Sequence, residues 1–288
     1  MGQPIFRGYD REALDREYNN RLKVANAAEL LAWCAAESET TRRELDCRCD
    51  VAYGSHPGEM LDIFPTNDQR PAPVHVFIHG GYWHRLDKSD FSYVARAFVP
   101  AGVAAVVINY ALMPDVTMDE LVRQCRASIA WVHGNAASFG GDRDRITVSG
   151  HSAGGHLVAM IMATDWSSFR VPSDVVKTGC GISGLYDLEP IRLCYLNDVL
   201  KLTPDDVRRH SPVLLPPPRS GHLILAVGGL EGAEYHRQTD VLATAWRRGG
   251  LRCDVMDMTG LDHFTIAAQL GEATSELSRA ILAEMGLR

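Results

Sequence analysis

The stretch ITVSGHSAGGHL, residues 146–157, joins a β-branched run to a serine between glycines and then to a segment of small residues. Gly150 and Gly154 flank Ser152 in the spacing G-x-S-x-G, between a predicted strand and a predicted helix. So sharp a strand-to-helix turn leaves no room for side chains at its flanks, and it lifts the serine hydroxyl above the sheet edge. We therefore predict that Ser152 is a nucleophile. A chance match in an ordinary turn is the alternative.

Strand-like and helix-like segments alternate on both sides of this stretch. The helical patterns include residues around 88–100 and 118–140, and the strand-like runs lie at 74–80, 103–110, 145–150, 175–184, 222–229 and 252–258. Segments 47–54 and 60–65 flank the turn composition SHPGE and are predicted to form a hairpin. The order predicts an α/β fold: a mainly parallel central sheet, helices on both faces, and an antiparallel hairpin at the N-terminal edge.

Composition limits the class of protein further. The chain has 288 residues and is 46% hydrophobic, so we expect a single domain over 1–288 with one large core. The net charge of −7 argues against nucleic acid or an anionic membrane as a partner. The polar N-terminus and the lack of an apolar run of about eighteen residues predict a cytoplasmic protein. The seven scattered cysteines predict free thiols.

A serine nucleophile needs a general base within hydrogen-bond reach, and in this architecture the histidine comes last along the chain. The segment MTGLDHFTI places His263 in a loop between the strand at 252–258 and a C-terminal helix. We predict that His263 is the base, with an ordinary surface-loop histidine as the alternative. Its neighbour Asp262 cannot easily turn back to orient the ring, so it is predicted to be a loop or capping residue.

The carboxylate that orients the base is expected between the serine and the histidine, after the strand HLILAVGG. Glu231 is nearest to the end of that strand and is preferred. Glu234 lies where a helix begins, so capping of the first turn would also explain it. Asp187, after the preceding strand, is the third candidate, because some proteins of this architecture carry the acid one strand earlier.

The pentapeptide HGGYW, residues 79–83, follows the strand-like run that ends near Ile78. Gly80 and Gly81 bare the backbone there, so their amides, together with that of Ala153, are expected to form an oxyanion hole. His79 is expected to anchor this loop.

Tyr82 and Trp83 put two aromatic side chains beside the glycines, and we predict that they bind a flat group of the substrate. Packing of the loop onto the body is the equally weighted alternative. The helix-like segment 1–45 is expected to cover the active site in part, with a small cap or none elsewhere. No HExxH, Walker loop or nucleotide-binding GxGxxG occurs, so we expect no metal and no cofactor.

Longer stretches resemble the kynurenine formamidase (arylformamidase) group of the α/β-hydrolase superfamily. These stretches are YNNR (18–21), HGGYW (79–83), NYALMPDVTMDELVRQCRASIAWV (109–132), FGGDRDRITVSGHSAGGHL (139–157), SGLYDLEPI (183–191), EYHRQT (234–239) and LDHF (261–264). The family usually has Asp at the position that matches Glu231, which is one methylene longer. The resemblance implies a serine hydrolase that cleaves an aryl formamide or small acyl arylamide, such as N-formylkynurenine, through an acyl-enzyme.

Two other functions use the same residues. A carboxylesterase or amidase that acts on short-acyl or aryl esters and amides would need the same sharp turn around Ser152, called the nucleophile elbow, and the same oxyanion loop. A catalytically silent hydrolase fold would have lost a member of the triad, and all three positions are filled here. The expected partner is a small-molecule aryl or acyl substrate. The sequence does not determine the oligomeric state, and a homodimer is among the states that it allows.

Overall fold

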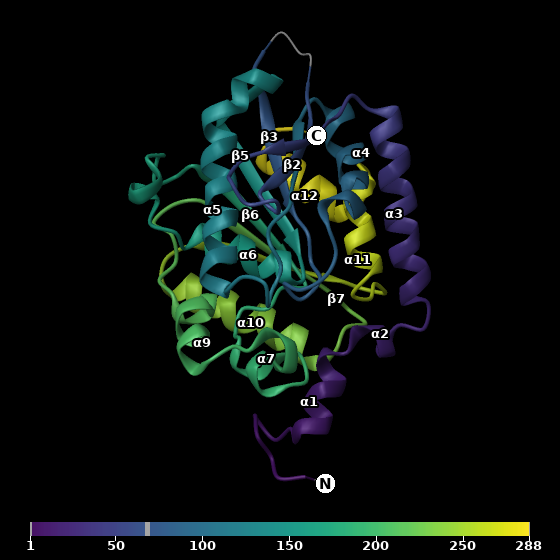
Figure 1. Cartoon of the computed structure of the whole chain (residues 1–288), viewed down its shortest axis with the longest axis vertical. Helices are drawn as coiled ribbons and strands as arrows, with labels where there is room; N and C mark the ends of the chain where they lie inside the picture. Colours follow the sequence, from purple (N-terminus) through teal and green to yellow (C-terminus); the bar gives the residue numbers. More distant parts are fainter. Residues whose placement is uncertain (1, 67–69, 288) are drawn as a thin grey trace.

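The computed structural model describes residues 2–66 and 70–287 and is built around an eight-stranded sheet in the order β1-β2-β4-β3-β5-β6-β7-β8 (Figure 1). The strands are β1 (Arg48–Ala52), β2 (Met60–Phe64), β3 (Ala72–Ile78), β4 (Ala104–Ile108), β5 (Gly141–His151), β6 (Val176–Ile182), β7 (His222–Gly228) and β8 (Arg252–Met258). The pairs β1–β2 and β2–β4 are antiparallel, and every other neighbouring pair is parallel. The predicted parallel sheet with an antiparallel N-terminal edge hairpin is confirmed.

Helices cover both faces of this sheet. In Figure 1, α5 and α6 lie on one side, and α4, α11 and α12 lie on the other with α3 alongside them. The α-helices are α1 (Arg11–Tyr18), α2 (Asn20–Lys23), α3 (Ala27–Glu44), α4 (Ala95–Phe98), α5 (Met118–Asn135), α6 (Ala153–Met162), α7 (Glu189–Leu193), α8 (Asn197–Leu200), α9 (Pro204–His210), α10 (Ala233–Arg248), α11 (Thr265–Ala268) and α12 (Glu276–Glu284).

The central strands β3, β4 and β7 are buried on both faces because each face of the sheet has its own core. In β3, Val76 and Ile78 pack into the core shared with α5, α6 and α10, whereas Phe77 between them packs into the core shared with α4, α11 and α12. Successive side chains of a strand point to opposite faces, so a strand covered on both sides must be apolar throughout. Burial on both faces thus explains the short continuous apolar runs of the sequence.

The segment expected to form one helix around 88–100 is broken into short turns. These turns are Lys88–Asp90, Ser92–Val94, α4 and Val99–Ala101. Asp87 caps the first turn by accepting a hydrogen bond from the Ser89 amide, and Phe91 leaves helical geometry with φ −126°. Pro100 has no amide hydrogen to continue a helix. By contrast, α5 keeps its predicted start at residue 118, because the Thr117 side chain caps it.

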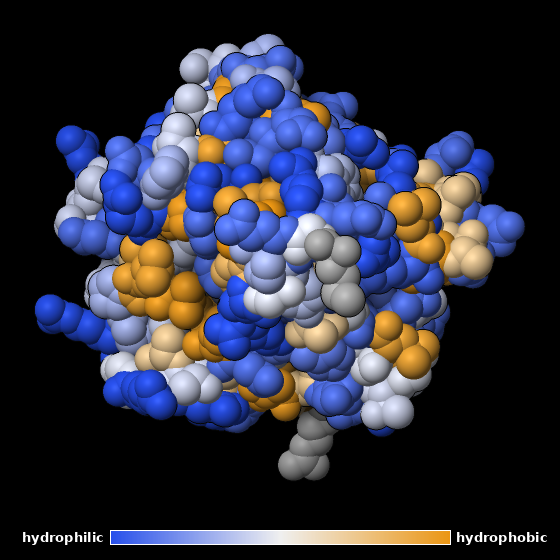
Figure 2. Space-filling model, turned by 90° about the horizontal axis from the view of Figure 1, so that it is seen from below, coloured by the Kyte–Doolittle hydropathy of each residue, from blue (hydrophilic) through white to orange (hydrophobic). Residues whose placement is uncertain are grey.

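A small helical layer lies beyond one end of the sheet. Between β6 and β7 the chain forms α7, α8 and α9, and the N-terminal helix α1 contacts both α7 and α10 (Figure 1). The view from below shows apolar side chains in separate groups among polar ones (Figure 2). Among the described residues, no helix is long and apolar enough to cross a membrane.

Candidate active site

Ser152 stands at the turn between β5 and α6. Its backbone has φ 57° and ψ −117°, and its amide donates a hydrogen bond of 2.8 Å to the carbonyl of Ile182. A Cβ added at Gly150 would collide with the backbone of Gly154, and one added at Gly154 would collide with the carbonyl of Ile78. The strained serine and its two flanking glycines are therefore required by the turn itself.

Three side chains from separate loops lie in series at this turn. The His263 Nε2 atom lies 3.2 Å from the Ser152 Oγ, and its Nδ1 atom lies 2.6 Å from the Glu231 Oε2. All three side chains are almost fully buried. A carboxylate that accepts from Nδ1 leaves Nε2 unprotonated and facing the hydroxyl, which is the tautomer that a general base needs.

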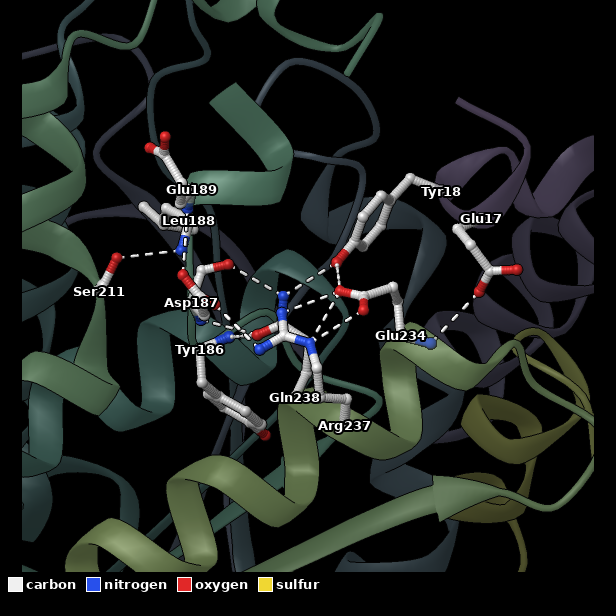
Figure 3. Close-up of polar contacts among 10 residues, drawn as sticks. All are labelled: Glu17, Tyr18, Tyr186, Asp187, Leu188, Glu189, Ser211, Glu234, Arg237 and Gln238. Atoms are coloured by element: carbon white, nitrogen blue, oxygen red, sulfur yellow. Dashed lines mark hydrogen bonds and ion pairs between the residues drawn. The ribbon is translucent and has the colours of Figure 1, made fainter. Parts of the chain in front are cut away.

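The two alternative acids, Asp187 and Glu234, do not lie at His263, and both contact the guanidinium group of Arg237. The Arg237 guanidinium lies between Asp187 and Glu234, with N···O distances of 3.0 and 2.8 Å (Figure 3). The Tyr18 hydroxyl donates to the same Glu234 carboxylate at 2.8 Å. Glu234 thus joins the N-terminal segment to α10, and Asp187 joins α10 to the loop after β6. Neither carboxylate contacts His263.

The second oxygen of Glu231 is also held. It accepts a hydrogen bond of 2.8 Å from the Gly228 amide and another from the Ser183 hydroxyl. Ser183 directly follows β6 and has a positive φ of 49°, which turns its side chain towards the end of β7. The sequence reasoning missed Ser183, although it opens the stretch SGLYDLEPI.

The loop after β3 presents free amides next to Ser152. In the described part of the chain, the amides of Gly80, Gly81 and Ala153 donate no hydrogen bond to a protein acceptor. An added Cβ at Gly80 would lie 2.9 Å from the His151 carbonyl and 3.1 Å from the Ser152 Cβ. The bare backbone is therefore what lets this loop approach the serine.

His79 holds the start of the same loop. Its ring nitrogens lie 2.9 Å from the Asn109 Oδ1 and 2.8 Å from the Gly80 carbonyl oxygen, and its ring stacks on Tyr110 at 4.3 Å. These contacts agree with the prediction that His79 anchors the loop. Asn109, at the end of β4, is a partner that the sequence reasoning did not find.

A cavity of about 270 Å³ opens beside the serine. Ser152, His151 and His263 lie in its wall, as do Gly81 and Tyr82 from the loop after β3. The N-terminal segment contributes Asn19, Asn20, Arg21, Leu30, Leu31 and Cys34 to the same wall. Residues far apart in the sequence thus meet around one space next to the nucleophile.

Trp83 does not reach this cavity, contrary to the prediction that it binds substrate. Its side chain is fully buried, and its indole N–H donates to the His156 Nδ1 at 3.2 Å. The opposite ring nitrogen of His156 lies 2.7 Å from the carbonyl oxygen of His210. Burial lowers the pKa of His156 to about 3, so the ring is neutral and can accept the indole proton. Trp83 ties the oxyanion loop to α6.

Tyr82 lies in the cavity wall, but its hydroxyl is already bonded. It donates to the Tyr18 carbonyl at 2.6 Å and lies 2.7 Å from the Tyr235 hydroxyl. The Asn20 amide group reaches both tyrosine hydroxyls, at 3.3 and 2.7 Å. Only the ring of Tyr82 is thus available to a substrate, and its polar end fastens the N-terminal segment.

We expect Trp83→Ala to lower the free energy of unfolding by about 3–5 kcal/mol, because it leaves a cavity between the loop and α6. The same change should reduce kcat/KM for an aryl formamide and for a small aliphatic ester by similar factors, since the indole touches neither substrate. Denaturant unfolding and parallel kinetics on both substrates measure the two effects. An unchanged free energy of unfolding, with a loss of kcat/KM confined to the aryl substrate, would show that Trp83 contacts the substrate.

His151 is a further residue that the sequence reasoning passed over. Its ring lies 4.6 Å from that of His263, and its Nε2 atom has no hydrogen-bond partner in the described chain. Burial, and then the neighbouring His263, keep the pKa of His151 well below its usual value. A neutral imidazole therefore lies against the proposed base and adds no charge to it.

Only one group of possible metal ligands occurs in the described chain, and it lies outside the cavity wall. Asp119, Asp206 and His210 bring their ligand atoms within 4.8 Å of one another. The Arg209 guanidinium already binds both carboxylates, at 2.9 and 2.7 Å. An arginine thus supplies the positive charge that a cation would bring.

A serine hydroxyl, an imidazole and a carboxylate in series, set at the ends of strands in a mainly parallel sheet, define a serine hydrolase of the α/β-hydrolase class. Residues 61–176 match the family model described as BD-FAE. The kynurenine formamidase of Danio rerio is 32% identical over 86% of this chain and 85% of its own length. The kynurenine formamidase of Salmo salar is 34% identical over 82% of this chain and 81% of its own length. The chain belongs to the kynurenine formamidase family.

A solved structure gives the same picture. It is a Silicibacter protein provisionally named a thioesterase, with a TM-score of 0.82 and 29% identity over 93% of this chain and 98% of its own. The overall fold of this chain is therefore also found in a solved structure that it matches over nearly the full length of both chains.

Proposed function

We propose that this protein hydrolyses N-formyl arylamines, with N-formylkynurenine as the type substrate, to formate and the free arylamine. The observation that carries the proposal is the series Ser152–His263–Glu231 beside a cavity with an aromatic and aliphatic wall, in a chain of this family. All of these residues come from one chain, so the site needs no second copy.

The proposed reaction begins with attack of the Ser152 Oγ on the formyl carbon, while His263 Nε2 takes the hydroxyl proton. The negative oxygen of the tetrahedral intermediate faces the amides of Gly80, Gly81 and Ala153, which have no protein acceptor in the described chain. His263 then gives its proton to the aryl nitrogen as the C–N bond breaks. This step leaves a formyl ester on Ser152.

Water completes the cycle. His263 takes a proton from the water as its oxygen attacks the formyl ester, and returns that proton to the Ser152 oxygen as formate leaves. Glu231 keeps the imidazole in the required tautomer and stabilises its protonated form. The balance is one formamide and one water consumed for one formate and one arylamine.

The alternative is an esterase acting on short-acyl or aryl esters. Esterase LipC of Mycobacterium tuberculosis supports it with 34% identity, but over only 48% of this chain, whereas the formamidases match over 86% and 82%. The same attack and the same oxyanion donors serve both reactions, so substrate preference decides between them.

A side-by-side measurement of kcat/KM on N-formylkynurenine, formanilide and p-nitrophenyl acetate tests the proposal, with Ser152→Ala as the blank. We expect the highest value for N-formylkynurenine, and release of formate and arylamine in equal amounts. A higher value for the ester, with negligible release of formate from both formamides, would overturn the proposal in favour of the esterase.

We further propose that residues 1–288 act as a single domain in the cytoplasm. All seven cysteines are free thiols in the structure, five of them buried, which suits a reducing compartment. Non-reducing mass spectrometry of protein taken from cells checks this, because a disulfide would contradict it.

A further inference from the structure

The wall of the cavity beside Ser152 contains cationic residues. Arg21, at the second position of α2, and Arg85, in the loop after β3, both lie in its wall together with His84. None of the residues that line the cavity is an aspartate or a glutamate. In a chain with a net charge of −7, this is a local reversal of sign at the proposed active site.

Neither arginine is neutralised within the described chain. Arg123 and Arg237 each bind two carboxylates, whereas Arg21 and Arg85 form no ion pair with any described residue. Burial first, then the charge of Arg85 and that of Arg21, lower the pKa of His84. The two guanidinium groups therefore act on a common region, and both disfavour the charged form of the His84 imidazole.

The cavity wall also contains a group of apolar residues. Leu30, Leu31, Leu86, Phe91, Phe264 and Ala267 line it, from α3, the loop after β3 and the region of α11. A ligand that fills the cavity should thus combine a ring or another apolar body with a negative group.

The backbone holds both arginines in relation to the reaction centre. Gly81, with φ +105°, packs against the carbonyl of Arg85, and its own carbonyl accepts from the His84 amide at 3.2 Å. Arg21 follows Asn20, whose side chain is bonded to the Tyr235 hydroxyl at 2.7 Å. The Tyr235 ring lies 4.7 Å from that of His263.

We propose that Arg21 and Arg85 bind a carboxylate of the substrate and so select aryl amides that carry an anionic side chain. Guanidinium groups suit this task because they stay charged and pair with both oxygens of a carboxylate. The inference rests on the proposed function for the identity of the scissile bond, but it assigns the anion site by charge and position alone.

The test compares N-formylkynurenine with its α-carboxamide, which differs only in the charge at that end. In Arg21→Gln and in Arg85→Gln, the ratio of kcat/KM for the acid to kcat/KM for the carboxamide should fall on the order of ten- to hundredfold, the range expected for a lost charged hydrogen bond. The loss should lie in KM rather than in kcat, because it removes ground-state binding. Arg143→Gln, an exposed arginine outside the cavity, is the matched control and should keep the wild-type ratio.

A second measurement separates this inference from the proposed function. The product kynurenine and its carboxamide are tested as competitive inhibitors of p-nitrophenyl acetate hydrolysis, which requires no formamide cleavage. We expect the acid to inhibit the wild type more strongly than the carboxamide, and this preference to disappear in Arg21→Gln/Arg85→Gln.

Equal losses on acid and carboxamide in the arginine variants, with no change in the inhibition preference, would overturn the anion site and leave the formamidase proposal intact. Failure of the wild type to cleave N-formylkynurenine, with the inhibition preference present, would overturn the formamidase proposal and leave the anion site.

Discussion

Ser152→Ala and His263→Ala are each expected to lower kcat by about 10⁴-fold or more, since neither the nucleophile nor the base has a substitute. The Ser152 Oγ lies within hydrogen-bond distance of His263 Nε2, and the imidazole that lies against the base, that of His151, is neutral and buried. Single-turnover and steady-state rates on N-formylkynurenine and on p-nitrophenyl acetate measure the loss on both substrate classes.

The double variant Ser152→Ala/His263→Ala should be only slightly worse than either single variant, because the two groups act as one unit. Labelling with a fluorophosphonate provides an independent readout and should disappear in Ser152→Ala. Circular dichroism and thermal unfolding establish that each variant is folded. A His263→Ala enzyme that keeps about a tenth of the wild-type kcat would show that another group is the base.

Glu231→Gln is expected to lower kcat by roughly 10²–10⁴-fold while the fold persists. One oxygen of Glu231 accepts from His263, and the other accepts from the Gly228 amide and the Ser183 hydroxyl. Glutamine has only one acceptor oxygen. Its amide group must therefore face either the imidazole N–H or the Gly228 N–H, and the first arrangement favours the wrong tautomer of His263.

Glu234→Gln and Asp187→Asn are the matched controls, since both acids bind Arg237 and not the base. They should change kcat far less than Glu231→Gln. Glu234→Gln should lower the melting temperature instead, because it weakens the buried contacts with Arg237 and Tyr18. A larger loss of kcat in Glu234→Gln than in Glu231→Gln would move the orienting role to Glu234.

Glu231→Asp introduces the residue that the family usually has at this position. The glutamate side chain folds back so that its carboxylate reaches the amide of Gly228, three residues earlier in the same turn. Aspartate is one methylene shorter, and this loop is shaped for the longer side chain. We expect an activity between those of the wild type and Glu231→Gln, measured as kcat on the same substrates.

Local patterns sufficed wherever neighbouring residues and the backbone alone decide the geometry. The elbow is one such place, because the glycines at 150 and 154 are needed by any chain that turns from a strand into a helix around Ser152. The alternating order of strands and helices predicted the sheet for the same reason, since central strands such as β3 and β4 are apolar on both faces.

Local patterns failed where a side chain's direction depends on a turn with unusual backbone angles. Tyr82 and Trp83 both have positive φ, at 50° and 60°, and this pair of angles sends the indole into the interior against His156. Neither residue type reveals such a conformation in advance, since positive φ is uncommon outside glycine. The sequence therefore allowed a substrate wall or loop packing for Trp83, and the structure has the packing.

The amino-acid sequence by itself determined the class of sheet, the nucleophile's turn and the place of the histidine, because short-range backbone geometry and apolar periodicity decide them. Which acid lies against His263 was decided by tertiary structure, since it depends on where Arg237 lies relative to Asp187 and Glu234. The same holds for the presence of Arg21 and Arg85 in the wall of one cavity. These two arginines are far apart along the chain, and the packing of the N-terminal segment against the loop after β3 brings both of them to one cavity.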